Sequence, residues 1–342
     1  MAEKPRSKAP KGHKTAESEG MPVATPSATV RALSIPELLF VIFAFSEKPE
    51  LARSARVCKD WSDAALDELW KDLDSIFPLL ELVLDLDLLR TASHNSATPE
   101  AYEDISSALA NADWSRFYSH AKRVQSLEYV EGHDYRELED MPALGSSVIG
   151  VICLHYPYGP CLLPHLRKAL WYSGSGSALS ILPFLPKDLA HLDLELFGSS
   201  DGQLKAAFNA FRNRSLHLKS FTFSTEVAGP ISDAALGLWL ETMETLESVK
   251  LPDYYLTTPV LSRIGTLPRL RVIDLFKASF DDDQVESTDA RMVGELPSGS
   301  FPSLVELSLP ATPATAQRLL FNSRTDFAGL TRLDLNAEKD IE

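Results

Sequence analysis

The stretch "LAHLDL", residues 189–194, decides the fold because its pattern returns along the chain. It reads apolar, two variable residues, apolar, one variable residue, apolar. Alternating apolar and polar residues predict a strand that buries only one face. The same pattern occurs in "VQSLEY", "LKSFTF", "LESVKL", "LRVIDL", "LVELSL" and "LTRLDL", which begin at Val124, Leu218, Leu246, Leu270, Leu304 and Leu330.

The spacing of these copies indicates a repeat. From Leu189 onward, most gaps fall within the roughly 20 to 29 residues of leucine-rich repeats. The segments "DGQLKAAFNAF" and "ISDAALGLWLETM" between them have helical patterns, and one strand-helix unit cannot bury its apolar face without neighbours. The sequence therefore predicts an α/β solenoid, with degenerate copies at Leu166 ("LRKALW") and Val148 ("VIGVIC"). A three-layer α/β sandwich is disfavoured because its central strands would be continuously apolar.

A different pattern precedes the repeats. The segment "ARVCKDWSDAALDELW", residues 55–70, holds two of the chain's five tryptophans. We expect three short amphipathic helices here, the first beginning with a capping box of Ser34 and Glu37. The second carries residues 51–58 and the third residues 61–73. Such a small unit buries little by itself, so its surplus of apolar residues indicates a docking partner.

The chain therefore divides into four segments, and its fold class is α+β overall, a three-helix module followed by an α/β solenoid. Residues 1–30 lack apolar periodicity, which predicts a disordered tail. Residues 31–75 form the helical module, and residues 76–120 a helical linker with a polar loop that begins at Arg90. Residues 121–342 form the solenoid, which ends directly after a repeat pattern and leaves an incomplete array open.

The composition excludes several classes of function. A net charge of −15 disfavours nucleic-acid binding, because phosphate backbones are repelled. The longest apolar runs are far shorter than the roughly 20 residues of a membrane span, and the N-terminus lacks the apolar core of a secretory signal. Three cysteines without framework spacing fit reduced thiols. We therefore expect a cytoplasmic or nuclear protein that binds neither membranes nor nucleic acids.

One motif suggests a hydrolase. Residues 198–202 read G-x-S-x-G between a predicted strand and a predicted helix, the context of a nucleophile elbow at Ser200. That fold needs an acid and then a histidine downstream of the serine. The only later histidine is His217, and the only acid between the two is the adjacent Asp201. A turn after a repeat strand is therefore the better interpretation.

Candidate metal and cofactor sites are equally weak. Cys153, His155, Cys161 and His165 do not have the spacing of a common zinc module. The acidic stretch from Phe280 lacks the glycine that a calcium loop needs at its sixth position. No phosphate-binding P-loop motif is found. The sequence predicts no catalytic residue, no metal and no cofactor, so the chain is not expected to be an enzyme.

The helical module resembles an F-box. "IPEL" at residues 35–38 resembles the family's opening Leu-Pro-Glu-Leu, "VCKDW" at 57–61 its Val-Cys-x-x-Trp, and "LW" at 69–70 its closing Leu-Trp. From about residue 31 the whole chain resembles F-box proteins of the leucine-rich-repeat kind. The positions carried over from the family as adaptor-binding are Leu33, Ile35, Pro36, Glu37, Leu38, Ile42, Phe43, Leu51, Val57, Cys58, Trp61, Leu69 and Trp70.

The resemblance implies a substrate-recognition subunit of a Skp-cullin-F-box ubiquitin ligase. The F-box would bind a Skp-type adaptor, and through it a cullin, while the repeats would bind a protein target. Within each repeat strand, the variable residue between the last two apolar positions is expected on the open sheet face. These candidate target-binding residues are Glu128, Asp193, Thr222, Lys250, Asp274, Ser308 and Asp334.

The acidic members of this row suggest a target with a basic surface. Two alternatives stay open. One is a leucine-rich-repeat scaffold without a ligase role, and the other is a hydrolase that uses Ser200.

Overall fold

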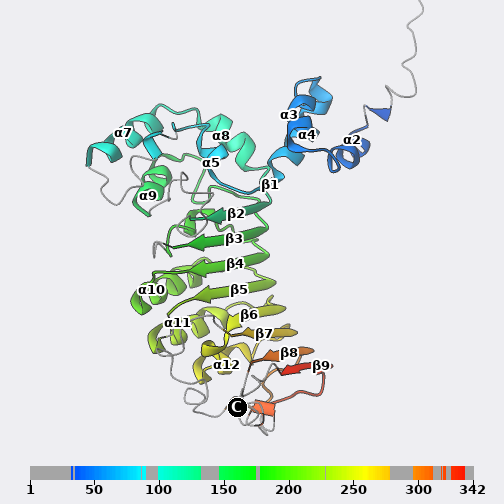
Figure 1. The fold of residues 1–342 in the computed structure, drawn as a ribbon, viewed down its shortest axis with the longest axis vertical. Helices are drawn as coiled ribbons and strands as arrows, with labels where there is room; N and C mark the ends of the chain where they lie inside the picture. Colours follow the sequence, from blue (N-terminus) through cyan, green and yellow to red (C-terminus); the bar gives the residue numbers. More distant parts are fainter. Residues whose placement is uncertain are drawn as a thin grey trace, which may run out of the picture.

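A parallel sheet of nine strands forms the body of the protein, and its strands follow one another in chain order (Figure 1). The computed structural model describes residues 32–33, 35–85, 87–89, 99–131, 146–174, 178–227, 229–277, 296–310, 317, 319–320 and 325–335. The strands are β1 (Asp72–Leu73), β2 (Ser126–Val130), β3 (Lys168–Ser173), β4 (His191–Leu196), β5 (Ser220–Thr225), β6 (Ser248–Pro252), β7 (Val272–Phe276), β8 (Glu306–Leu309) and β9 (Arg332–Leu335).

Helices cover one side of this sheet and extend beyond its first strand (Figure 1). Beside β4 to β7 lie α10 (Asp201–Arg212), α11 (Pro230–Leu240) and α12 (Thr258–Ile264), and short 3-10 turns occur at Leu182–Phe184 and Asp253–Tyr255. Near β1 and β2 lie α5 (Phe77–Leu80), α7 (Pro99–Ala110), α8 (Trp114–Ala121) and α9 (Ser146–His155). The N-terminal module consists of α2 (Pro36–Phe43), α3 (Lys48–Ser54) and α4 (Lys59–Lys71).

One backbone motif joins consecutive strands along the sheet. The carbonyl just before a strand accepts hydrogen bonds from two successive amides at the start of the next unit: the Arg167 carbonyl, for example, binds the amides of Ala190 and His191, both at 2.9 Å. The carbonyls of Gln125, Ala190, Lys219, Glu247, Arg271 and Val305 do the same. This recurrence keeps the strands parallel and in a common register.

The core lies between the sheet and the helices. Alternate strand residues such as Leu194 and Phe223 are fully buried there. Trp239 of α11 is the centre of an aromatic cluster, with ring centroids 4.9 Å from Phe221 and 5.0 Å from Phe211. Large aromatic side chains supply much of the buried area that holds such a sheet and its helices together.

Adjacent helices are also joined by close backbone packing. The Asp201 carboxylate accepts a hydrogen bond of 2.8 Å from the Ser232 amide and thereby caps α11 from the preceding unit. Gly229 permits this contact, because a Cβ atom at that position would lie 2.3 Å from Asp201 Cγ. Gly237 likewise allows α11 to approach the Pro259 carbonyl.

The structure confirms all seven predicted repeat strands and the degenerate strand that follows Leu166. The stretch at Val148 was predicted wrongly, because it lies in α9. Its run of apolar residues does not alternate, so pattern alone could not separate a buried helix from a strand. Strand β1, which continues directly from α4, was not predicted.

Helix boundaries also differ from the expectation. Ile35 is the N-cap of α2, with no side-chain cap, while Ser34 lies outside the described residues. The second helix ends at Ser54, and Cys58 is the N-cap of α4. The apolar segment after residue 75 is helical over Phe77–Leu80, continues in turns over residues 81–83, and is helical again at residues 87–89.

Two other expectations concern segments that the structure covers only in part. The predicted polar loop from Arg90 is wrong in its last part, since α7 begins at Pro99. The predicted tail, residues 1–30, and the acidic stretch from Phe280 lie outside the described residues. Within the described part of the chain, every helix is too short or too polar to span a membrane.

Candidate functional site

The N-terminal module presents an apolar surface on α2. Leu38, Val41 and Ile42 of α2, with Phe45 in the turn that follows it, keep helical spacing and are 44%, 59%, 46% and 89% exposed. Ile35, just before the helix, lies at the same spacing and is 43% exposed. We call these five residues the α2 surface. Single exposed apolar residues are common, but a continuous apolar helix face marks an interaction site.

The opposite side of α2 is held by a small core of its own. Leu39, Phe43, Leu51, Ala64 and Ala65 are buried together in a cluster separate from the main core. Because the cluster already uses the inward residues of α2, the α2 surface is not needed to stabilise the module.

Trp61 of α4 ties the module together. Its ring lies edge-on to Phe43 at 5.8 Å, and its indole N–H donates a hydrogen bond of 3.0 Å to the Leu33 carbonyl. A hollow of about 420 Å³ lies beside it, lined in part by Ile42, Phe43 and Ser46. Trp61 therefore shapes the module rather than extending its exposed apolar surface.

The predicted adaptor-binding residues fall into three groups in the structure. Exposed side chains belong to Ile35, Pro36, Glu37, Leu38, Ile42, Val57 and Cys58. Phe43 and Leu51 are buried in the small core, and Leu33, Trp61 and Leu69 pack against it. Trp70 packs instead against the main core. The sequence set omitted Val41 and Phe45, which helical spacing from Leu38 would have identified.

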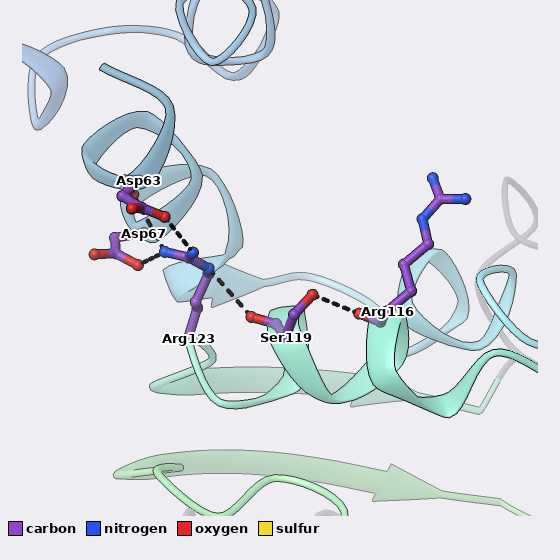
Figure 2. A network of polar contacts seen from close by, with 5 residues as sticks. All are labelled: Asp63, Asp67, Arg116, Ser119 and Arg123. Atoms are coloured by element: carbon purple, nitrogen blue, oxygen red, sulfur yellow. Dashed lines mark hydrogen bonds and ion pairs between the residues drawn. The ribbon is translucent and has the colours of Figure 1, made fainter. Parts of the chain in front are cut away.

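Arg123 joins the module to the rest of the protein (Figure 2). Its side chain is 13% exposed, and its guanidinium makes ion pairs with Asp63, at 2.9 Å, and with Asp67, both on α4. Its Nε donates to the Ser119 carbonyl of α8 at 3.2 Å. The Ser119 hydroxyl in turn donates to the Arg116 carbonyl at 2.8 Å. One cation thus connects α4 to the residues that follow α8.

An aromatic stack reinforces this junction. Trp70 of α4 stacks on His120 of α8 with centroids 4.5 Å apart. Burial lowers the pKa of His120, and the nearby Arg116 lowers it further, so the ring is held neutral. Because α4 also continues directly into β1, the module is fixed to the first strand of the sheet.

The second candidate surface is the side of the sheet opposite the helices, which we call the open face. The predicted target-binding residues form one row across it, since each pairs in register with the next from Asp193 to Asp334. Leu170 of β3 occupies the place between Glu128 and Asp193. All seven side chains are exposed or partly exposed.

Charges on the open face are partly paired. Lys250 lies 3.4 Å from Asp274 and 5.5 Å from the centroid of Phe276, and Arg332 lies 3.8 Å from Glu306. A hollow of about 310 Å³ lies over β7 to β9 and is lined in part by Asp274, Ser308 and Asp334. The row is therefore a mixed polar surface and not a uniform ladder of acids.

Ser200 has a structural role in this fold. It is the N-cap of α10 and forms a capping box with Gln203, whose side-chain oxygen accepts from the Ser200 hydroxyl at 2.8 Å. His217 lies 3.7 Å from Asp188, at an exposed site. The G-x-S-x-G motif thus begins a helix, in agreement with the turn interpretation.

The cysteines and histidines of the weak zinc motif have separate environments. His155 shares a hydrogen bond of 2.8 Å with the Ser106 hydroxyl, and His165 one of 2.7 Å with the Lys122 carbonyl. Burial raises the pKa of both Cys153 and Cys161, so both thiols stay protonated. Among the described residues, no group of three or more His, Cys, Asp or Glu side chains could hold a metal ion.

A comparison with known protein families finds a match for one part of the chain. Residues 36–75 match the family model of F-box-like domains. The matched range contains α2, α3, α4 and β1, and thus most of the α2 surface. A search of curated proteins gave no match to the chain.

Proposed function

We propose that this chain, which carries an F-box-like domain at residues 36–75, is a substrate-recognition subunit of a Skp-cullin-F-box ubiquitin ligase. The α2 surface binds a Skp-type adaptor, and the adaptor connects the chain to a cullin. The observation that carries this proposal is the coincidence of the family match with the continuous exposed apolar face of α2.

The chemistry of the α2 surface suits a permanent partner. Its residues are aliphatic or aromatic and are not required by the small core behind them. The centre of a stable interface is depleted in charge and enriched in such side chains, which are fully desolvated on binding. Val57, at the start of the Val-Cys-x-x-Trp motif, is a further exposed apolar residue of the matched range, at 61% accessibility.

The sheet has the second role in this proposal. We regard β2 to β9 and their connections as leucine-rich-repeat-like units that present a protein target on the open face. The recurring hydrogen bonds between successive units support this view. The chain itself carries out no chemistry, and it acts in the cytoplasm or nucleus. Its contribution to ubiquitin transfer is to hold a target in a fixed position relative to the adaptor, which the Arg123 junction favours.

The proposal is tested by capture of a purified Skp-type adaptor. Leu38→Asp combined with Val41→Asp places two charges in the α2 surface without touching the small core. We expect adaptor capture to fall at least about 30-fold, since central apolar anchors contribute about 2 kcal/mol or more each.

The matched control is Leu154→Asp, which adds a charge at an 80% exposed apolar residue of α9, away from the F-box-like domain. This control should capture the adaptor like the parent. Undiminished capture by the α2 double variant, with unchanged thermal stability, would refute the proposed contact.

A further inference from the structure

We propose that β9 pairs antiparallel with β9 of a second copy of this chain, about a two-fold axis at Leu333. The inference goes beyond the proposed function, which places adaptor binding on the α2 surface. β9 lies at the end of the sheet opposite β1 and the N-terminal module (Figure 1). The paired chains would therefore form one continuous sheet with an α2 surface near each outer end.

The leucines of β9 point to the helix side of the sheet but are not covered there. Leu333 and Leu335 are each 42% exposed. Their register neighbours on β8, Leu307 and Leu309, are 2% and 0% exposed. The apolar positions that an adjoining unit covers elsewhere along the sheet are thus partly open to water at β9, and a further strand beside β9 would cover them.

The backbone of β9 also has an open side. Arg332 donates its amide to the Val305 carbonyl at 3.1 Å, and successive residues of a strand direct their backbone groups to opposite sides. Those of Leu333 and Leu335 therefore point away from β8, where no strand of the described part of the chain lies. The Thr331 carbonyl occupies the position at which seven earlier carbonyls each accept two amides, and it accepts none from the described residues. Such an edge is a template for pairing with another strand.

The charges of β9 favour a second copy as the partner. Arg332 and Asp334 alternate with the leucines and therefore point to the open face. With a two-fold axis at Leu333, Arg332 of each chain stands directly opposite Asp334 of the other. Opposite charges at directly facing positions stabilise a strand pair, and like charges destabilise it. One strand that carries both signs at this spacing complements itself.

The same charges select one register. Because side chains alternate between the two faces, a shifted pairing must keep the leucines of both chains on the helix side. The two nearest shifts place Asp334 opposite Asp334 or Arg332 opposite Arg332, and like charges repel. With the axis at Leu333, the two Leu333 residues exchange backbone hydrogen bonds, and the Leu335 amide of each chain reaches the open Thr331 carbonyl of the other.

The expected dimer is weak and closed. β9 has four residues, and the pairing of two such edges buries less than the roughly 1,200 Å² of the smallest stable interfaces. We therefore expect a dissociation constant of about 10 to 100 μM. Because both chains use the same surface, the assembly stops at two copies.

The experiment is sedimentation velocity of the purified full chain at concentrations below and above this dissociation constant. Arg332→Asp leaves two acids on the open face of β9, and Asp334→Arg leaves two bases. Each variant alone should self-associate at least about tenfold more weakly than the parent, because both facing pairs become like charges. An equimolar mixture of the two variants should form the dimer again, since every facing pair is then opposite in charge.

The matched control is Glu128→Arg, which reverses an exposed charge on the open face at β2 and should associate like the parent. Arg332 also lies 3.8 Å from Glu306 of its own chain, so Arg332→Asp adds a repulsion there. Asp334→Arg leaves that pair intact and tests the contact without it. Recovery in the mixture shows in addition that both variants are folded at β9.

Four results would overturn the inference. They are a parent chain that stays monomeric throughout, as when another segment or protein covers β9, single variants that associate like the parent, a mixture that stays monomeric, and assembly beyond two copies. Adaptor capture by the same samples reports separately on the proposed function. Both single variants should retain capture fully, because the α2 surface takes no part in the β9 contact.

Discussion

Removal of the Trp61 ring should unfold the N-terminal module while the sheet stays folded. The ring packs edge-on against Phe43, and its N–H bonds to the Leu33 carbonyl. Trp61→Ala should lower the free energy of unfolding of the module by about 3 kcal/mol, which is at the low end of the usual loss for a core tryptophan because this ring is partly exposed. Trp61→Phe keeps most of the packing and loses one hydrogen bond, so it should cost about 1 kcal/mol.

The assay is amide hydrogen exchange followed helix by helix, together with adaptor capture. The small core of Leu39, Phe43, Leu51, Ala64 and Ala65 is separate from the main core, so protection should fall in α2 and α3 and persist in β3 to β6. Adaptor capture should decrease in Trp61→Ala in proportion to the unfolded fraction of the module. If α2 amides in Trp61→Ala remain as protected as in the parent, the reasoning is refuted.

Three further predictions concern the junction, the helix cap and the open face. Arg123→Ala should lower the free energy of unfolding by about 1 to 2 kcal/mol in a urea titration; the effect is modest because the acid partners Asp63 and Asp67 are exposed enough to remain hydrated. Arg123→Lys should lower it by less. Equal stability of Arg123→Ala and the parent would contradict the assigned role. Ser200→Ala should lower the free energy of unfolding by about 1 kcal/mol through loss of the α10 cap. The parent protein should not react with a serine-directed hydrolase probe, and labelling at Ser200 would support the hydrolase alternative instead. Burial raises the pKa of Asp193 and of Glu195, so the folded state binds protons more readily than the unfolded chain, and the two charges destabilise the fold above the raised pKa values. As the pH falls towards the unfolded pKa values, this destabilisation should disappear in the parent, and urea titrations across acid pH should show no such change in Asp193→Asn with Glu195→Gln. Identical pH profiles of the free energy of unfolding for the two proteins would argue against it.

The periodic parts of the structure could be predicted from the sequence. Each copy of the repeat pattern forms a strand that begins two residues after its first apolar residue, from Ser126 to Arg332. In β2 to β8 the alternation leaves only one way to bury the apolar residues, and register then follows, whereas Leu333 and Leu335 of β9 are each 42% exposed. The row from Asp193 to Asp334 was predicted for the same reason.

Features that depend on tertiary contacts could not be predicted. The stretch around Val148 is uniformly apolar, and its burial beside other elements favours helix α9 over a strand. Arg123 has no sequence signature, because its partners Asp63 and Asp67 are about 60 residues away. The ion pair between Lys250 and Asp274 joins register neighbours on β6 and β7, and which charged neighbours pair is revealed only by the geometry.

Trp61 illustrates a related difficulty in the module. A tryptophan in a recognised motif can be a contact residue or a core residue, and pattern cannot separate the two. The structure places Trp61 against the small core and leaves Leu38, Val41 and Phe45 at the surface.

The central claim is that the α2 surface binds a Skp-type adaptor through apolar burial. Titration calorimetry of the purified chain with a purified adaptor, repeated at several temperatures, tests it most directly. The account predicts a saturable complex with a negative heat-capacity change, the signature of apolar surface removed from water, and loss of both in Leu38→Asp with Val41→Asp. A parent chain that gives no complex at tens of micromolar, or one whose binding is unaffected by the two aspartates, would contradict it.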